Sequence, residues 1–162
     1  MNFGFNVSLG REVELYNRVK SNDPSTAGLV LMILALSGIE ADAAMKDRTT
    51  FADILSASTI EVTNTGYTRE VFTDADLDAL VVDHTNNQIL IAVPLVSFGG
   101  PNVAAGDTWE KAILGYDPDT TGGADSAIIP ITAHDVRFGG SAIVPNGSPA
   151  VVDLSAGFAV AR

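Results

Sequence analysis

Residues 109–135 read WEKAILGYDPDTTGGADSAIIPITAHD, a polar segment between two runs rich in apolar and β-branched residues. The first run, 109–117, and the second, which extends over 127–138, have the length and composition of β-strands. Apolar runs joined by a short polar connection are typical of a hairpin. We therefore predict two antiparallel strands here, with a turn between them.

The polar segment between these strands has residues suited to a turn. Proline at position 118 fixes one backbone angle, and Asp117 can accept a hydrogen bond from the backbone that follows it. Gly122 and Gly123 can adopt the positive φ angles that a tight connection needs. The segment therefore predicts a turn.

The same segment partly matches a calcium-binding loop. Such loops place oxygen ligands at alternate positions, with a glycine at the sixth position and a bidentate acid at the twelfth. The sixth position is Gly122, but the twelfth is Ile128, and the flanking segments look like strands rather than helices. Calcium is thus an alternative to the plain turn. Its candidate ligands are Asp117, Asp119, Thr121 and Asp125.

The chain from residue 56 onward is rich in valine, isoleucine, threonine and aromatic residues, with turn signals such as NTG, DHTNN and PNG. Signals spaced by about ten residues are typical of sandwiches and barrels. Further strands are predicted at 66–73, 88–98 and 150–161. Pro94 and Pro130 interrupt two of the strand-like runs and indicate edge strands or bulges.

The N-terminal third predicts helices and one strand. Residues 8–23 are expected to form a helix capped by Ser8, with an apolar stripe. The stripe consists of Leu9, Val13, Tyr16 and Val19. The apolar run 29–36 fits a strand or a short helix, and the glycines on both sides favour a central strand. Residues 49–55 predict a short helix that begins with a capping box formed by Thr50 and Asp53.

The fold class expected from these elements is α+β, mainly β: an antiparallel β-sandwich with an N-terminal helix and one or two short helices. A chain of 162 residues fits a single domain, 1–162. Within it, residues 8–55 form a helix-containing part and 56–162 a β-rich part. Residues 1–7 could form an extended arm.

Phe3 and Phe5 are the candidate assembly contacts in this arm. An apolar segment near a chain end is disordered unless it is held by other parts of the structure. The two rings either dock on their own domain or reach a neighbouring subunit. Both alternatives stay open from the sequence.

The charge of the chain limits the classes of partner that we expect. The net charge is −11, and residues 70–162 carry three Lys or Arg against twelve Asp or Glu. Phosphate backbones and anionic membrane surfaces need clustered Lys and Arg, so we expect no nucleic acid and no membrane partner. The apolar run 28–39 is too short to span a bilayer, and the N-terminus lacks the pattern of a secretory signal.

No catalytic or cofactor site is predicted, and we expect the protein not to be an enzyme. Zinc needs three or four ligands, but the chain has no cysteine and only two histidines, His84 and His134. A triad of Ser141, His134 and Asp135 is conceivable, although no G-x-S-x-G elbow is present.

Two other features are more simply explained by structure than by chemistry. The alternating acids Asp74, Asp76 and Asp78 fit a solvated loop better than a glycosidase pair, because no cleft is indicated. Trp109, the only tryptophan, could stack on a sugar but fits a large core residue better.

Several segments resemble small virion structural proteins of tailed bacteriophages. The resemblance follows the order of the chain over nearly its whole length and rests on turns and strand edges. It is carried by ELYNRVKSNDP, TNTGYTREVFTDADLDA, VDHTNNQ, AILGYDPDTTGGADSAIIPITAHD and SAGFAVAR. It implies a non-enzymatic assembly protein that is made in the host cytoplasm and resides in the virion as a homo-oligomer. Its implied partners are other virion proteins, either the major capsid protein or tail proteins.

Two locations in a virion remain open. An acidic protein would repel packaged DNA, so the first expectation is a capsid decoration or cement protein on the head exterior, which stabilises the particle through subunit contacts. The alternative is a tail- or fibre-associated module that contacts the host surface.

Overall fold

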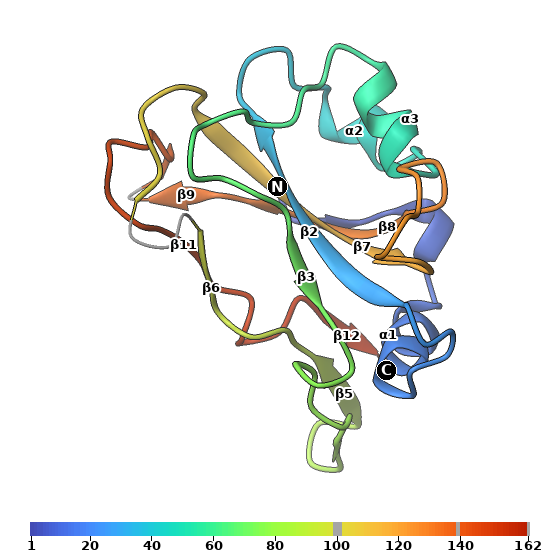
Figure 1. Ribbon diagram of the computed structural model, residues 1–162. Helices are drawn as coiled ribbons and strands as arrows, with labels where there is room; N and C mark the ends of the chain where they lie inside the picture. Colours follow the sequence, from blue (N-terminus) through green and yellow to red (C-terminus); the bar gives the residue numbers. More distant parts are fainter. Residues whose placement is uncertain (99–101, 139, 162) are drawn as a thin grey trace.

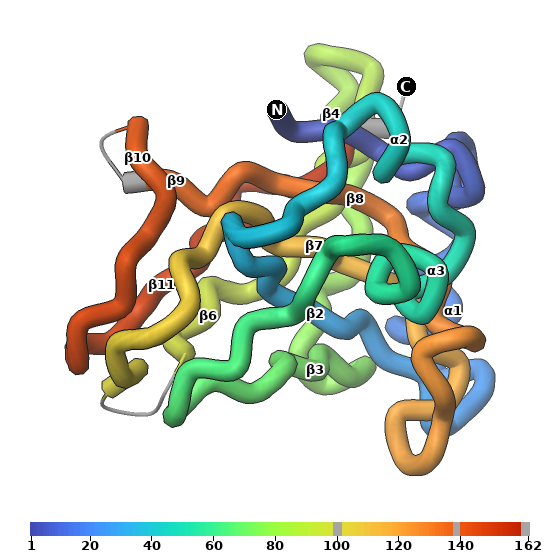
Figure 2. Tube along the Cα trace, turned by 90° about the horizontal axis from the view of Figure 1, so that it is seen from above, coloured from blue at the N-terminus to red at the C-terminus, as the bar shows by residue number. Residues whose placement is uncertain are grey.

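The computed structural model describes residues 1–98, 102–138 and 140–161, and its centre is a five-stranded antiparallel sheet (Figure 1). Figure 2 shows four of its strands side by side in the order β8, β7, β2, β3. The strands, in spatial order, are β1 (Phe3–Gly4), β8 (Ile129–Asp135), β7 (Trp109–Asp117), β2 (Gly28–Ala35) and β3 (Glu70–Phe72). The predicted pair of strands in residues 109–135 is confirmed as β7 and β8.

Three smaller antiparallel ladders and four short helices complete the described structure. The first ladder comprises β12 (Ala159–Ala161), β5 (Gln88–Ile91) and β4 (Val82–Asp83), the second β11 (Ala150–Val152) and β6 (Val96–Phe98), and the third β10 (Ser141–Ala142) and β9 (Arg137–Phe138). The helices are η1 (Asn6–Ser8), α1 (Glu12–Lys20), α2 (Asp42–Met45) and α3 (Phe51–Ser56).

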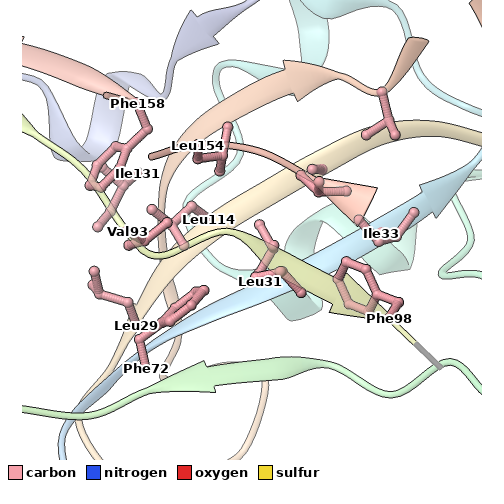
Figure 3. Packing of buried hydrophobic residues seen from close by; sticks show 14 of the residues in the cluster. Leu29, Leu31, Ile33, Phe72, Val93, Phe98, Leu114, Ile131, Leu154 and Phe158 are labelled. Carbon is pink, nitrogen blue, oxygen red and sulfur yellow. The ribbon is translucent and has the colours of Figure 1, made fainter. Parts of the chain in front are cut away.

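The main sheet is covered on both faces, which explains why β2 is apolar at every position after Gly28. Alternate residues of a strand point to opposite faces. Val30 and Met32 pack with Phe51 of α3 on one face. Leu29 and Leu31 pack on the other face with the smaller ladders and α1, the cluster that Figure 3 shows.

The predicted class, α+β and mainly β with short helices, is confirmed. The second layer of the sandwich is made of short ladders rather than one continuous sheet. The predicted strand 88–98 splits into β5 and β6, which pair in different ladders, and Pro94 lies between them. The predicted strand 150–161 likewise splits into β11 and β12.

The prediction of a bulge or edge at Pro130 is confirmed. The register between β7 and β8 shifts between Leu114, which faces Thr132, and Gly115, which faces Pro130. The ring of Phe51 packs against Gly115 so closely that a Cβ there would lie 2.5 Å from Phe51 Cε1. The bulge thus occurs where α3 lies directly on the sheet.

The predicted helix 8–23 is shorter than expected. The helix α1 begins at Glu12, and Ser8 does not cap it, because Ser8 Oγ donates to the carbonyls of Phe5 and Ile131. Leu9 lies before the helix and is 59% exposed, so it is not part of the apolar stripe. Tyr16 and Val19 are buried as predicted.

The predicted short helix at 49–55 is confirmed as α3. Thr50 is its N-cap and accepts a hydrogen bond from the backbone N–H of Asp53. In return, the Asp53 carboxylate accepts from the N–H of Thr49 at 3.0 Å, one residue before the position of a standard capping box. The predicted central strand at 29–36 is also confirmed, as β2.

The turn between β7 and β8 is confirmed, with one correction to its mechanism. Asp117 Oδ1 accepts from the N–H of Asp119 at 2.9 Å, as predicted. Neither Gly122 nor Gly123 has a positive φ, so that part of the prediction was wrong. Gly123 is required for space instead, because a Cβ would lie 2.4 Å from the carbonyl oxygen of Asp119.

Candidate assembly surface

The residues considered for a catalytic triad are not brought together. His134 Nε2 hydrogen-bonds Thr132 Oγ1 at 3.0 Å, and burial lowers the pKa of His134. Asp135 is instead paired with Lys111 and with the amine of Met1. Ser141 is the first residue of β10, in a different ladder.

The other residues weighed for chemistry have structural roles. Trp109 is buried and donates from Nε1 to Asn64 Oδ1 at 3.0 Å, so it is a core residue as predicted. Asp76 accepts from the N–H and the hydroxyl of Thr73, which closes an exposed turn. His84 lies exposed in the turn between β4 and β5.

Two of the calcium candidates are bound within the chain. Asp125 Oδ2 accepts from Arg69 Nη2 at 2.9 Å, and this pairing lowers the pKa of Asp125 despite its partial burial. Asp119 Oδ1 accepts from the N–H and the hydroxyl of Thr121. No group of three or more His, Asp or Glu side chains in the described ranges is arranged to hold a metal ion.

The N-terminal segment docks on its own domain. Phe3 and Gly4 form β1 and pair with β8, and the N–H of Phe5 donates to the carbonyl of Ile131 at 3.0 Å. Phe5 is fully buried between the main sheet and the short helices. Residues 1–7 therefore do not form a free arm in this structure, and Phe5 cannot be an exposed assembly contact.

An ion cluster around the buried side chain of Lys111 also holds the N-terminal segment. Lys111 Nζ, on β7, pairs with Asp135 on β8 and with Asp42 Oδ1 at 3.0 Å. The amine of Met1 contacts Asp135 Oδ2 at 2.6 Å. Burial opposes ionisation of Asp135, but the hydrogen bonds from Lys111 and Met1 outweigh it and lower its pKa to about 2.

The surface best suited to an assembly contact lies on the hairpin of β4 and β5, which projects from the body of the protein (Figure 1). We call it the hairpin surface and define it by its exposed apolar side chains. These are Val81 and Leu90, which line the same groove. Exposed apolar side chains gathered on a projecting element indicate an interaction site more strongly than isolated ones do.

A groove of about 420 Å³ runs along the hairpin surface. Its apolar lining comes from the segment 79–81, from Leu90 and from the segment 92–94. Asp76 and Asp78 add carboxylates, and none of the described residues that line the groove is basic. The groove is therefore apolar and acidic.

The hairpin surface could not be located from the sequence. The residues VV before the turn DHTNN and ILI after it predict strands, but not which side chains face solvent. Leu90 lies on β5, the central strand of a three-stranded sheet, and is 44% exposed. The interruption of the strand pattern by Pro94 was the sequence feature that pointed to this division of the strands.

In the part of the chain that the structure describes, no helix has the length and hydrophobicity to cross a membrane. Comparisons of the chain with protein-family models, with curated proteins and with solved structures found no match.

Proposed function

We propose that this protein is a non-enzymatic virion structural protein of a tailed bacteriophage, a decoration or cement protein on the exterior of the head. The observation that carries the proposal is the hairpin surface, an apolar and acidic surface on a projecting part of a β-rich domain. It adds to the sequence resemblance to phage virion proteins described above.

The properties of the chain are consistent with this role. Cement proteins stabilise a particle by adding contacts between subunits, which requires a folded body and an exposed surface for the partner. The net charge of −11 suits a location away from packaged DNA. The proposed partner is the major capsid protein, and the protein would act as a homo-oligomer.

The test is to locate the protein on purified particles by gold-labelled antibody and electron microscopy. We expect label over the whole head. Label confined to the tail or its tip would overturn the decoration role and support the alternative, a tail- or fibre-associated module that contacts the host surface. Absence of label from every particle would overturn the virion proposal itself.

A matched pair of variants tests whether the hairpin surface makes the contact. Val81→Ser removes an apolar side chain that is 75% exposed, and Val144→Ser removes one that is 66% exposed on a different segment. Both should fold normally, because exposed substitutions change stability by only about 0.5 kcal/mol. We expect Val81→Ser to reduce the amount of protein that sediments with particles and Val144→Ser to leave it unchanged.

A further inference from the structure

The groove of the hairpin surface is lined by residues of two segments that belong to none of the ladders. Residues 78–81 lead into β4, and residues 92–95 connect β5 to β6. Within the described chain, no main-chain hydrogen bond engages the N–H groups of Ala79, Leu80 or Ala92. Backbone groups of this kind can pair with an added strand.

The side chains along these segments favour an extended ligand. Val81 and Leu90 present apolar surface, and Pro94 also lines the groove. In strand addition, main-chain hydrogen bonds give affinity and alternate side chains of the ligand enter apolar pockets. The groove offers both features along the same line.

The charge of the groove determines the partner. Asp78 is exposed, has no cation within salt-bridge distance among the described residues, and lines the groove together with Asp76. Such carboxylates attract a basic segment and repel an acidic one. A second copy of this chain brings a net charge of −11, which opposes self-association through the groove.

We propose that the groove binds an extended segment of a partner protein that carries alternating apolar and basic side chains, which adds as a strand beside residues 78–81. This names the partner of the surface invoked in the proposed function and so rests on it. The test uses the purified protein and peptides alone. The peptide test can therefore fail while the particle assay succeeds, and the particle assay can fail while the peptide test succeeds.

The probes are fluorescein-labelled heptapeptides, measured by fluorescence anisotropy. The first alternates valine and lysine, the second valine and glutamate, and the third serine and lysine. We expect the valine–lysine peptide to bind at least about tenfold more tightly than either of the others. Equal binding of all three, or no binding of the valine–lysine peptide, would overturn the proposal.

Two variants place the binding in the groove. Val81→Ser should weaken the valine–lysine peptide by about fivefold or more, whereas Val144→Ser should not change its affinity. Asp78→Asn should weaken the same peptide and reduce the salt dependence of its binding. The hydrogen bond from Tyr16 goes to the main-chain oxygen of Asp78, so this variant keeps that contact.

Backbone pairing is tested separately. The valine–lysine peptide with N-methyl groups on alternate residues keeps its side chains but loses hydrogen-bond donors, and we expect its affinity to fall by about tenfold. Hydrogen exchange should show new protection at Ala79 and Leu80 in the complex with the unmodified peptide. Undiminished binding of the methylated peptide, or a dimer of the free protein that Val81→Ser dissociates in sedimentation, would contradict the added-strand model.

Discussion

Arg69 and Asp125 face each other between the segment before β3 and the connection of β7 to β8, and their side chains pair through two hydrogen bonds. On its other side, Arg69 Nε donates to Glu61 Oε1 at 2.9 Å and Nη2 donates to Glu61 Oε2 at 2.7 Å. Its guanidinium also lies 5.6 Å from the centre of the Phe51 ring. One arginine thus joins the segment that contains Phe51 and Glu61 to Asp125, which lies 56 residues further along the chain than Arg69.

Replacing Arg69 should therefore destabilise the fold. Arg69→Met leaves Glu61 and Asp125 without their cation in a partly buried site, and we expect a loss of about 2–3 kcal/mol in the free energy of unfolding. Arg69→Lys keeps the charge but not the planar, two-sided geometry, and should recover only part of the loss. Urea denaturation measures the free energy of unfolding of both variants. If Arg69→Lys were as stable as the wild type, the charge of the side chain, and not its geometry, would account for the stabilisation.

The same pairing predicts no stabilisation by calcium. Asp125 is held by Arg69 and Asp119 by Thr121, so a cation would have to displace existing bonds at both positions. A ligand that binds only the folded state raises the melting temperature. We expect identical thermal melts with millimolar calcium and with a chelator, and a higher midpoint in calcium would restore the calcium-loop interpretation of 117–125.

The elements predictable from the sequence are those whose signals are local. The hairpin of β7 and β8 has apolar runs and an Asx-type turn at Asp117, and α3 has its cap at Thr50. Each of these signals lies within a few residues of the structure that it specifies. Local chemistry was therefore sufficient for them.

The elements that could not be predicted depend on distant partners. Val96 pairs with Val152, and Ile91 pairs with Ala159, so the strands that surround Pro94 belong to different ladders. Nothing near Pro94 in the sequence specifies those partners. The hairpin surface and the groove arise from this division, which is why the candidate site became visible only in the structure.

The pairing of Asp135 with Lys111 predicts a pH dependence of stability. The pKa of Asp135 is lowered to about 2 in the folded protein, below the ordinary value of 3.8. Its contribution is thus fully present above about pH 5 and is lost progressively as the pH falls toward 2, because the unfolded chain binds the proton more readily. Asp135→Asn should cost about 2 kcal/mol at pH 6 and progressively less at lower pH.

Urea denaturation of the wild type and of Asp135→Asn at pH 6, 4 and 2.5 measures this dependence. The difference between the two proteins should shrink across the series. Asp153→Asn is a control for an exposed, local contact, because among the described residues Asp153 accepts hydrogen bonds only from Ser155 and lies on the surface. A constant difference for Asp135→Asn would contradict the ionised pairing with Lys111.

The position of Phe5 predicts that the N-terminal segment is needed for the fold itself. Phe5→Ala empties a fully buried site between the sheet and α3, and should cost about 3–5 kcal/mol, whereas Phe3→Ala, at a half-buried edge position, should cost about 1 kcal/mol. Deletion of residues 1–7 should unfold the domain, so loss of particle binding after that deletion would not identify an assembly arm. Urea denaturation distinguishes the cases: a deletion variant as stable as the wild type would contradict the role of the segment in this core.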